Sequence, residues 1–246
     1  MFRFGCIFFI LFFSCKENIV NLEFNKLAIN LPNATSYPIF VKDSCALEKQ
    51  FVSKGLININ SLDSSIRVSL QYSTSHNFLK KPIYEGLQDC YLPCEVAIKL
   101  SNAHYFLKQQ FPYYNIIVFD ATRPLSVQTL MWNDFEMPAK DKINYLAHPN
   151  DISLHNYGAA VDVGIISNDA LLLNMGTEFD TFEELSKPKM ENQFYLEGKL
   201  SKHALANRLL LRQVMCKAGF TGITSEWWHF NATTKLNAAN KYTLIE

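Results

Sequence analysis

Two short segments of the chain carry side chains that could bind a metal ion. His155 and Asp162 lie seven positions apart, and His229 follows Glu226 by three positions near the C-terminal end. Two imidazoles and one carboxylate suit a catalytic zinc ion that keeps its fourth position for water. His229 would be the third ligand. Glu226 would lie close to the ion without binding it, and its expected role is general base to the zinc-bound water.

The spacing of His155 and Asp162 constrains the backbone between them. Because seven is odd, a regular strand would place the two side chains on opposite faces. The valines on either side of Asp162 disfavour a helix. We therefore expect a turn or bulge near Gly158, where a glycine suits the conformation. Asp162 also lies in the apolar run 159–166, and a buried carboxylate is unfavourable unless it is paired or bound to a metal.

Each fragment also has an ordinary structural interpretation. His155 alone could be a loop histidine, and Asp162 alone could pair with a buried arginine. Trp227 and Trp228 could simply pack in the core. The fragments occur together, and this combination favours chemistry. We expect the remaining histidines on the surface or in loops: His76, His104, His148 and His203.

The hydrophobic pattern predicts the elements that position these residues. Apolar residues recur at helical spacing over 95–110. Ser201 suits the N-cap of a helix over 201–218, and Pro124 suits the first turn of another helix. The segment 136–152 is expected to be a loop. Strands are predicted at 66–72, 115–119, 159–166, 220–224 and 227–231. We expect an α+β fold in a single domain, with a mainly antiparallel sheet packed with helices and the zinc site in a central cleft.

Composition narrows the classes of function. The 246 residues include 23 Lys and Arg and 23 Asp and Glu, so the formal net charge is zero. Such a chain has no basic excess for nucleic acid, and we expect no nucleic-acid partner. Hydrophobic residues make up 48% of the chain, which indicates a globular protein.

The N-terminus has the pattern of an export signal. Arg3 precedes an apolar stretch that is too short for a membrane span of about 20 residues. Ser14 directly precedes Cys15, which is similar to a bacterial lipoprotein signal; ordinary secretion and a buried strand are the alternatives. The expected location is periplasmic or on the outer surface, with the membrane reached only through a lipid on Cys15. The expected divisions are a signal peptide at 1–15, a tether at 16–50 and a catalytic domain at 51–246.

Two motifs together resemble a known enzyme family. The segment from His155 to Asp162 fits H-x-x-G-x-A-x-D, and the segment from Glu226 to His229 fits E-x-W-H. This pair resembles the zinc D-Ala-D-Ala peptidases, which include D,D-carboxypeptidases, L,D-type endopeptidases and D-alanyl-D-alanine dipeptidases. Further matches favour the dipeptidase branch, of the vancomycin-resistance and cell-wall-recycling type. They lie in the family's order at 66–78, 120–124, 175–180 and 207–220.

The resemblance implies a reaction and the residues that carry it. One zinc ion per chain is bound by His155, Asp162 and His229. Glu226 is the catalytic base for hydrolysis of the dipeptide D-alanyl-D-alanine, and Arg123 stabilises the oxyanion. Arg123 also has a structural alternative, as a core arginine that pairs with a neighbouring aspartate.

A dipeptidase must recognise both ends of a very small substrate. Asp180 matches the family position that binds the ammonium group. We expect Ser153 to donate to the carboxylate and Tyr72 to line the amine side, although turn capping or packing could equally explain these two residues. An anionic Asp180 would disfavour longer peptides, whose amine is acylated.

Other functions stay open from the sequence. One is a D,D-carboxypeptidase or endopeptidase that acts on peptidoglycan stem peptides, which export slightly favours. Another is a non-catalytic zinc module that binds wall peptides, although Glu226 and Arg123 are both present. The last is an exported structural scaffold, which leaves a buried Asp162 unexplained.

Overall fold

The computed structural model describes residues 45–143 and 145–246 of the chain. The predicted signal peptide, Cys15 and the tether up to residue 44 lie outside the described residues. The first described helix, α1 (Ala46–Ser53), crosses the predicted boundary between tether and catalytic domain at residue 50. No helix within the described ranges is both long and apolar enough to span a membrane.

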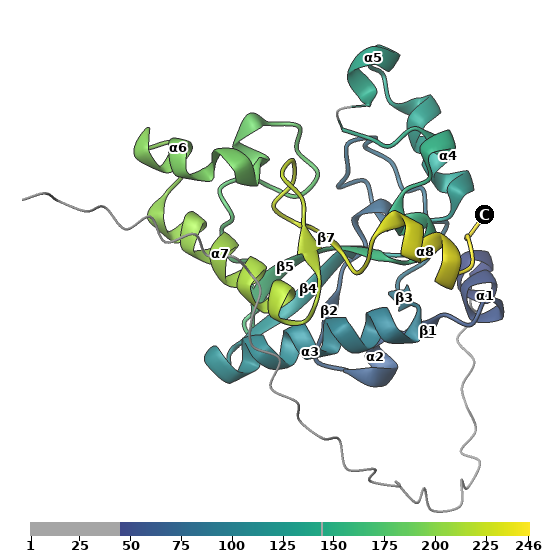
Figure 1. The fold of residues 1–246 in the computed structure, drawn as a ribbon, viewed down its shortest axis with the longest axis horizontal. Helices are drawn as coiled ribbons and strands as arrows, with labels where there is room; N and C mark the ends of the chain where they lie inside the picture. The colour runs from purple at the N-terminus through teal and green to yellow at the C-terminus, as the bar shows by residue number, and fades with distance from the viewer. Residues whose placement is uncertain (1–44, 144) are drawn as a thin grey trace, which may run out of the picture. The chain divides into compact units, whose positions relative to one another are not determined.

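A five-stranded sheet forms the centre of the fold (Figure 1). The strand order is β2 (Arg67–Val68), β4 (Tyr114–Asp120), β5 (Ala160–Ser167), β7 (His229–Asn231) and β6 (Thr221–Gly222). The β2–β4 pair is parallel, and the other three pairs of this sheet are antiparallel. A separate antiparallel pair joins β1 (Ile57–Asn58) to β3 (Tyr91–Leu92). These pairings confirm the expected α+β fold with a mainly antiparallel sheet.

Two long helices pack on the central strands. α3 (Cys94–Gln110) contacts β4, while α7 (Lys202–Lys217) contacts both α3 and β5. The core side chains Leu100 of α3 and Val214 of α7 are fully buried. Because β4 and β5 are buried along almost their whole length, their positions at the site are fixed by packing on both sides.

Shorter segments stand on two sides of the strands. Figure 1 shows α4 (Leu125–Asp134) and α5 (Ala139–Lys142) on one side and α6 (Glu191–Leu196) on the other. The remaining helices are α2 (Ile59–Leu62), α8 (Lys235–Lys241) and the 3-10 helices η1 (Gln71–Ser73), η2 (Pro149–Asp151), η3 (Leu154–Tyr157), η4 (Glu184–Ser186) and η5 (Pro188–Met190).

The long periodic segments match the sequence predictions closely. The helices predicted over 95–110 and 201–218 are confirmed as α3 and α7. Ser201 Oγ accepts a hydrogen bond from the Ala204 N–H at 3.1 Å, which is the expected N-cap contact. Pro124 directly precedes α4, as predicted.

Short segments differ more from the predictions. The strand predicted at 66–72 is reduced to β2, because the chain forms η1 from Gln71. The loop predicted at 136–152 contains α5 and η2. The surface position expected for His104 is wrong, since its side chain is buried with Nδ1 at 2.8 Å from Asp63 Oδ2.

Candidate active site

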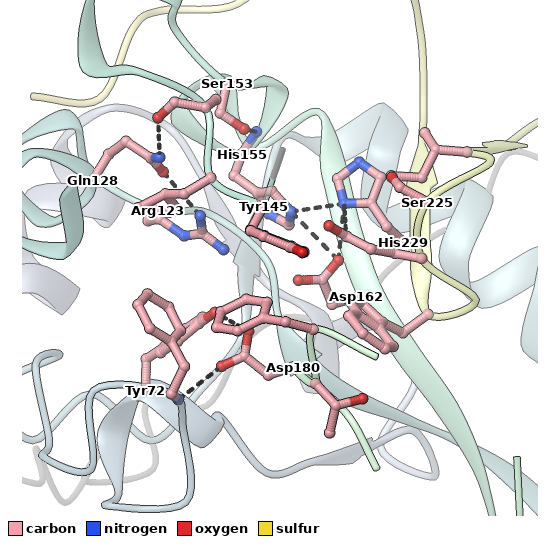
Figure 2. A pocket seen from close by; sticks show the side chains of 18 of the residues that line it. Tyr72, Arg123, Gln128, Tyr145, Ser153, His155, Asp162, Asp180, Ser225 and His229 are labelled. Carbon is pink, nitrogen blue, oxygen red and sulfur yellow. Dashed lines mark hydrogen bonds and ion pairs between the residues drawn. The ribbon is translucent and has the colours of Figure 1, made fainter. Parts of the chain in front are cut away.

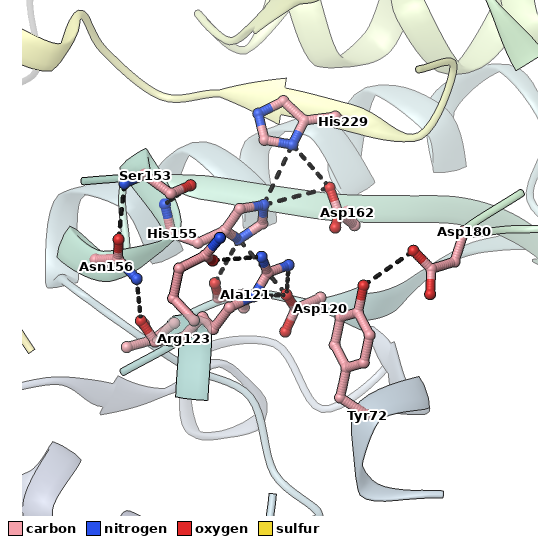
Figure 3. Close-up of polar contacts among 12 residues, drawn as sticks. Tyr72, Asp120, Ala121, Arg123, Ser153, His155, Asn156, Asp162, Asp180 and His229 are labelled. Atoms are coloured by element: carbon pink, nitrogen blue, oxygen red, sulfur yellow. Dashed lines mark hydrogen bonds and ion pairs between the residues drawn. The ribbon is translucent and has the colours of Figure 1, made fainter. Parts of the chain in front are cut away.

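Three neighbouring strands bring polar side chains to one face of the sheet. Asp120 on β4 lies opposite Asp162 on β5, and Asp162 lies opposite His229 on β7. Directly opposed residues of paired strands point to the same face, so these side chains form a row across the sheet (Figure 3). The β4–β5 pairing is irregular just before Asp120, where β4 reaches this row.

Gly158 turns the chain between His155 and Asp162. η3 carries His155, and Gly158 ends η3 with a φ of 62°, in the left-handed region. A Cβ atom at this position would lie 2.6 Å from Thr122 Oγ1 and 2.7 Å from Pro93 Cδ. Both the backbone angle and the close contacts therefore require glycine, and the predicted turn is confirmed.

The three predicted metal ligands lie together. His155 Nε2 is 3.2 Å from His229 Nδ1 and 3.5 Å from Asp162 Oδ1, and His229 Nδ1 is 2.9 Å from Asp162 Oδ1. The outer nitrogen of each ring faces an acceptor. His155 Nδ1 lies 2.6 Å from the Ala121 carbonyl oxygen, and His229 Nε2 lies 2.8 Å from Asn231 Oδ1. These acceptors favour a proton on the outer nitrogens, which leaves the inner nitrogens able to bind a metal.

The charges of this group favour a cation. One donor atom from each of the three residues lies within 4.8 Å of the others. Burial raises the pKa of the Asp162 carboxyl, but His155 and His229 lower it by more than burial raises it. The net pKa therefore lies well below the usual range. Burial lowers the pKa of His229, but Asp162 raises it, to about 9. An ionised carboxylate beside two imidazoles matches the three-residue ligand set of catalytic zinc sites.

Glu226 lies beside this ligand group, in the connection between β6 and β7. Its Oε2 is 3.9 Å from His229 Nδ1, and its side chain is 26% exposed. Burial raises the pKa of the Glu226 carboxyl. The next residue, Trp227, is buried, and its Nε1–H donates to Thr177 Oγ1 at 2.9 Å. Trp227 and Trp228 are both buried, which confirms that they pack in the core. Because they directly follow Glu226, they also fix its position.

Arg123 is a buried arginine with three side-chain hydrogen bonds. Its Nε and Nη2 donate to Asp120 Oδ2 at 3.0 and 2.5 Å, and its Nη1 donates to Gln128 Oε1 at 2.8 Å. Burial lowers the pKa of the guanidinium, but the Asp120 carboxylate raises it, and the net pKa is well above the ordinary value. Arg123 therefore does pair with a neighbouring aspartate, as its structural alternative predicts. Because Arg123 also lines the central cavity, the pairing holds a permanent positive charge at the cavity wall.

Asp120 connects the arginine to the metal-ligand group. Its Oδ2 is 3.8 Å from His155 Nδ1, and its Oδ1 accepts a short hydrogen bond from the Tyr84 hydroxyl. The Arg123 N–H donates to the His155 carbonyl oxygen at 3.0 Å, so backbone and side chain both tie these segments together. One buried carboxylate thus orients the arginine and lies near one of the predicted metal ligands.

Asp180 and Tyr72 meet across the cavity from the histidines. The Tyr72 hydroxyl donates to Asp180 Oδ1 at 3.0 Å, and the Phe78 N–H donates to Asp180 Oδ2 at 3.1 Å. Burial raises the pKa of the Asp180 carboxyl to about 7, although both hydrogen bonds and Arg123 lower it. Asp180 adopts a φ of 64°, an uncommon conformation that aspartate tolerates better than most residues.

Arg208 of α7 holds the segment that carries Asp180. Its Nε–H donates to the Met175 carbonyl oxygen at 2.5 Å, and its Nη2–H donates to the Leu185 carbonyl oxygen at 3.0 Å. One fully buried guanidinium therefore fixes the chain on both sides of Asp180. A side chain without direct access to the cavity determines where this carboxylate lies.

Ser153 forms the N-cap of η3 and also lines the cavity. Its Oγ accepts from the His155 N–H at 3.3 Å, and its own N–H donates to Asn156 Oδ1 at 2.7 Å. Ser153 therefore does cap a turn, as its structural interpretation predicts. Its hydroxyl proton makes no hydrogen bond to another described residue, so the group can still donate to a ligand in the cavity.

A cavity of about 170 Å³ joins these residues. This volume holds on the order of ten water molecules, which is the scale of a dipeptide. It is lined by all eight residues assigned above to chemistry or substrate binding, of which Figure 2 labels all but Glu226: Tyr72, Arg123, Ser153, His155, Asp162, Asp180, Glu226 and His229.

Further lining residues escape the sequence analysis. They are Phe78, Gln128, Tyr145, Phe182 and Lys187, together with several neighbours. In Figure 2, Tyr145 extends into the space between the histidines and Asp180. The aromatic residues come from loops without a hydrophobic period, so no local signal in the sequence identifies them. Gln128 lies five positions after Arg123, on the first turn of α4. Its place beside Arg123 could have been inferred from that helical position.

Comparisons with known proteins identify a family for this chain. The peptidase family M15 of D-Ala-D-Ala dipeptidases matches residues 52–244. The D-alanyl-D-alanine dipeptidase of Escherichia coli K12 is 27% identical over 190 residues, 77% of this chain and 89% of that protein. Enzymes of the same name from Synechocystis and Enterococcus faecium are 28% and 24% identical, over 62% and 72% of this chain and 73% and 90% of those proteins.

A solved structure of the LdcB LD-carboxypeptidase is also similar, at 17% identity and a TM-score of 0.31, over 65% of this chain and 84% of that chain. The family match covers most of the chain, and among the described residues the cavity contains one group of three side chains that could hold a metal ion, together with a buried arginine. The chain therefore belongs to the D-Ala-D-Ala dipeptidase family of peptidases.

Proposed function

We propose that this protein is a zinc-dependent dipeptidase that hydrolyses D-alanyl-D-alanine to two molecules of D-alanine. The observation that carries the proposal is the position of Asp180. The partly buried Asp180 carboxylate lies in the same dipeptide-sized cavity as the His155–Asp162–His229 group and Glu226. A free dipeptide offers an ammonium group to such a carboxylate, whereas the acylated nitrogen of a longer peptide does not.

The ligand group would hold one zinc ion through His155 Nε2, Asp162 Oδ1 and His229 Nδ1. When bound, the ion supplies Lewis-acid polarisation of the peptide carbonyl and lowers the pKa of water. The carbonyl oxygen of Ala121 orients His155, and Asn231 orients His229.

Glu226 and Arg123 would act directly on the reacting atoms. Glu226 takes a proton from the attacking water while the water oxygen bonds to the carbonyl carbon. The Arg123 guanidinium lies ready for the negative charge that develops on the carbonyl oxygen, in a buried setting where such a charge pair is strong. Glu226 then returns the proton to the amine as the carbon–nitrogen bond breaks.

The two ends of the dipeptide would bind opposite walls. The ammonium group pairs with Asp180, whose carboxylate Tyr72 and Phe78 already orient. The carboxylate accepts from the Ser153 hydroxyl at the start of η3. Recognition of both charged ends selects a molecule with one peptide bond between its ammonium and carboxylate groups, because the cavity fixes the distance between Asp180 and Ser153.

The first experiment measures release of D-alanine by the zinc-loaded protein comprising residues 16–246. Free D-Ala-D-Ala is compared with an N-acylated peptide that ends in D-Ala-D-Ala, and a chelator serves as control. We expect chelator-sensitive hydrolysis of the free dipeptide only. Hydrolysis of the acylated peptide would instead support a D,D-carboxypeptidase, and no hydrolysis of either by zinc-bound protein would favour a binding module.

Substituting Asp180 tests the ammonium site through pH. Below about pH 7 the Asp180 carboxyl is protonated and offers no charge, so KM for the free dipeptide should fall as pH rises through about 7. Asp180→Asn should raise KM at pH 7.5 by about 10- to 100-fold, since a charge-assisted hydrogen bond contributes about 1.5–3 kcal/mol. The variant should also lose the pH dependence of KM. A persistent pH dependence in the variant would assign it to another group.

The same substitution should stabilise the fold at alkaline pH. The folded-state pKa of Asp180, about 7, lies above its ordinary value of 3.8, so the folded protein holds this proton more tightly than the unfolded chain. Stability from this group is therefore complete below about pH 3.8 and is lost as pH rises through about 7. The melting temperature of Asp180→Asn should exceed that of the wild type by more at pH 8 than at pH 6, and an equal difference at both would contradict the assignment.

We also propose export and a lipid anchor on Cys15, on the sequence pattern alone. Expression of the full chain in a bacterium, with labelled fatty acid and cell fractionation, tests this. The label should appear in the membrane fraction and disappear in Cys15→Ala. A labelled Cys15→Ala protein, or an unlabelled wild type, would contradict the anchor.

A further inference from the structure

Four aromatic rings from four segments pack together beside Asp180. Phe182 lies two residues after Asp180 and contacts three of them, with ring centroids at 5.5 Å from Phe78, 5.0 Å from Phe135 and 4.7 Å from Tyr145. Phe78 and Phe135 are themselves 4.8 Å apart. We call these four residues the aromatic cluster.

The aromatic cluster joins two sides of the fold. Phe135 follows α4 and Tyr145 follows α5, which Figure 1 shows on one side of the strands. Phe182 belongs to the segment that leads through η4 and η5 to α6, on the other side. Because Phe182 reaches across to the other rings, the cluster closes the space between these two sides.

The cluster borders the cavity at the carboxylate. Phe78, Tyr145 and Phe182 line the cavity, while Phe135 packs behind them. The Phe78 N–H is also a hydrogen-bond donor to the Asp180 carboxylate. The lining rings of the cluster therefore lie next to the position proposed for the ammonium group.

A larger space lies on the other side of the same wall. A second cavity of about 800 Å³ is lined by Phe78, Asp180 and Thr181, which also line the first cavity. The wall between the two is thus a single layer of residues. Phe78, Asp180 and Thr181 separate this second cavity from the first, whereas Phe182 and Tyr145 line the first cavity only.

We propose that Phe182, supported by Tyr145, limits the substrate to a dipeptide by filling the space beyond the amine nitrogen. This inference rests on the proposed function, since it takes the ammonium group to lie at Asp180. It adds a steric barrier to the electrostatic preference of Asp180. The barrier is made of apolar rings, so it excludes any acyl group on that nitrogen, whatever the charge of the group.

Replacing Phe182 with alanine tests the barrier. The readout is the ratio of kcat/KM for an N-acetylated D-Ala-D-Ala to kcat/KM for the free dipeptide, in zinc-loaded protein. Even one methylene of extra space in a pocket alters discrimination by about 10- to 200-fold. We therefore expect Phe182→Ala to raise the ratio at least about tenfold. Inhibition of free-dipeptide hydrolysis by N-acetyl-D-alanine should strengthen in parallel.

Two further variants serve as a second test of the barrier and as a control. Tyr145→Ala removes a second lining ring and should raise the ratio in the same direction, which covers the case in which Phe182→Ala does not fold. Phe111→Ala removes a partly exposed ring that stacks on Tyr114 and lines neither cavity, and it should leave the ratio unchanged.

The outcomes separate the inference from the proposed function. If the folded Phe182 and Tyr145 variants keep the wild-type ratio, the steric barrier is wrong although the dipeptidase activity stands. The steric barrier would also be contradicted if Phe111→Ala raised the kcat/KM ratio as much as Phe182→Ala does. If the wild type hydrolyses no free dipeptide, the proposed function fails and the inference fails with it.

Discussion

Replacing Glu226 with glutamine is expected to lower kcat for dipeptide hydrolysis by about 10²- to 10⁴-fold, the usual contribution of a positioned general base. Glutamine has nearly the same shape as glutamate, but its amide cannot take a proton from water. Glu226 lies outside the ligand group, with its Oε2 at 3.9 Å from His229 Nδ1. The variant should therefore retain one zinc ion per chain, measured by elemental analysis, while turnover is measured as D-alanine release.

A second carboxylate provides the matched control. Glu183 also lines the cavity and is exposed. Glu183→Gln should keep kcat within about twofold of the wild type, because solvent-exposed charges contribute little. Near-normal hydrolysis by Glu226→Gln would show that the general base has been assigned to the wrong residue.

Replacing His155 with alanine should remove both zinc and turnover. His155 Nε2 lies 3.2–3.5 Å from the other two donor atoms, so the substitution leaves only two of three ligands. Loss of partners that merely orient a ligand already weakens metal binding about 10- to 100-fold, and loss of the ligand itself should weaken it further. We expect less than stoichiometric zinc after dialysis and D-alanine release at the level of the chelated wild type.

His203 is the control for this substitution. It is an exposed histidine on α7, outside the cavity. His203→Ala should bind zinc and turn over as the wild type does. A His155→Ala protein that keeps one tightly bound zinc ion would mean that the metal lies elsewhere.

The site could be predicted from sequence to the extent that its residues lie in short motifs. His155, Asp162 and His229 occur in two segments of at most eight residues. The turn at Gly158 follows from the odd spacing of His155 and Asp162, the valines beside Asp162 and the glycine itself. The position of Asp180, in contrast, depends on Arg208 of α7, which holds its loop from the far side. No local pattern carries that information, and the resemblance to a family supplied it.

The fold shows the same division between local and long-range information. α3 and α7 are long and periodic, and their ends were predictable to within one or two residues. α5 has four residues, too few for a periodic signal, and the aromatic cluster assembles rings from segments as distant as Phe78 and Phe182. His104 was misplaced because its burial depends on Asp63, forty-one residues earlier in the chain.

The row of Asp120, Asp162 and His229 has a consequence for folding. β7 has three residues, and so short a strand gives its pairing partner few contacts from which to choose the correct alignment. A slip of one residue would bring Phe230 opposite Asp162 and turn His229 to the opposite face. An ion that needs His155, Asp162 and His229 together binds only the correct alignment, so metal binding would stabilise the native register of β7 over a slipped one.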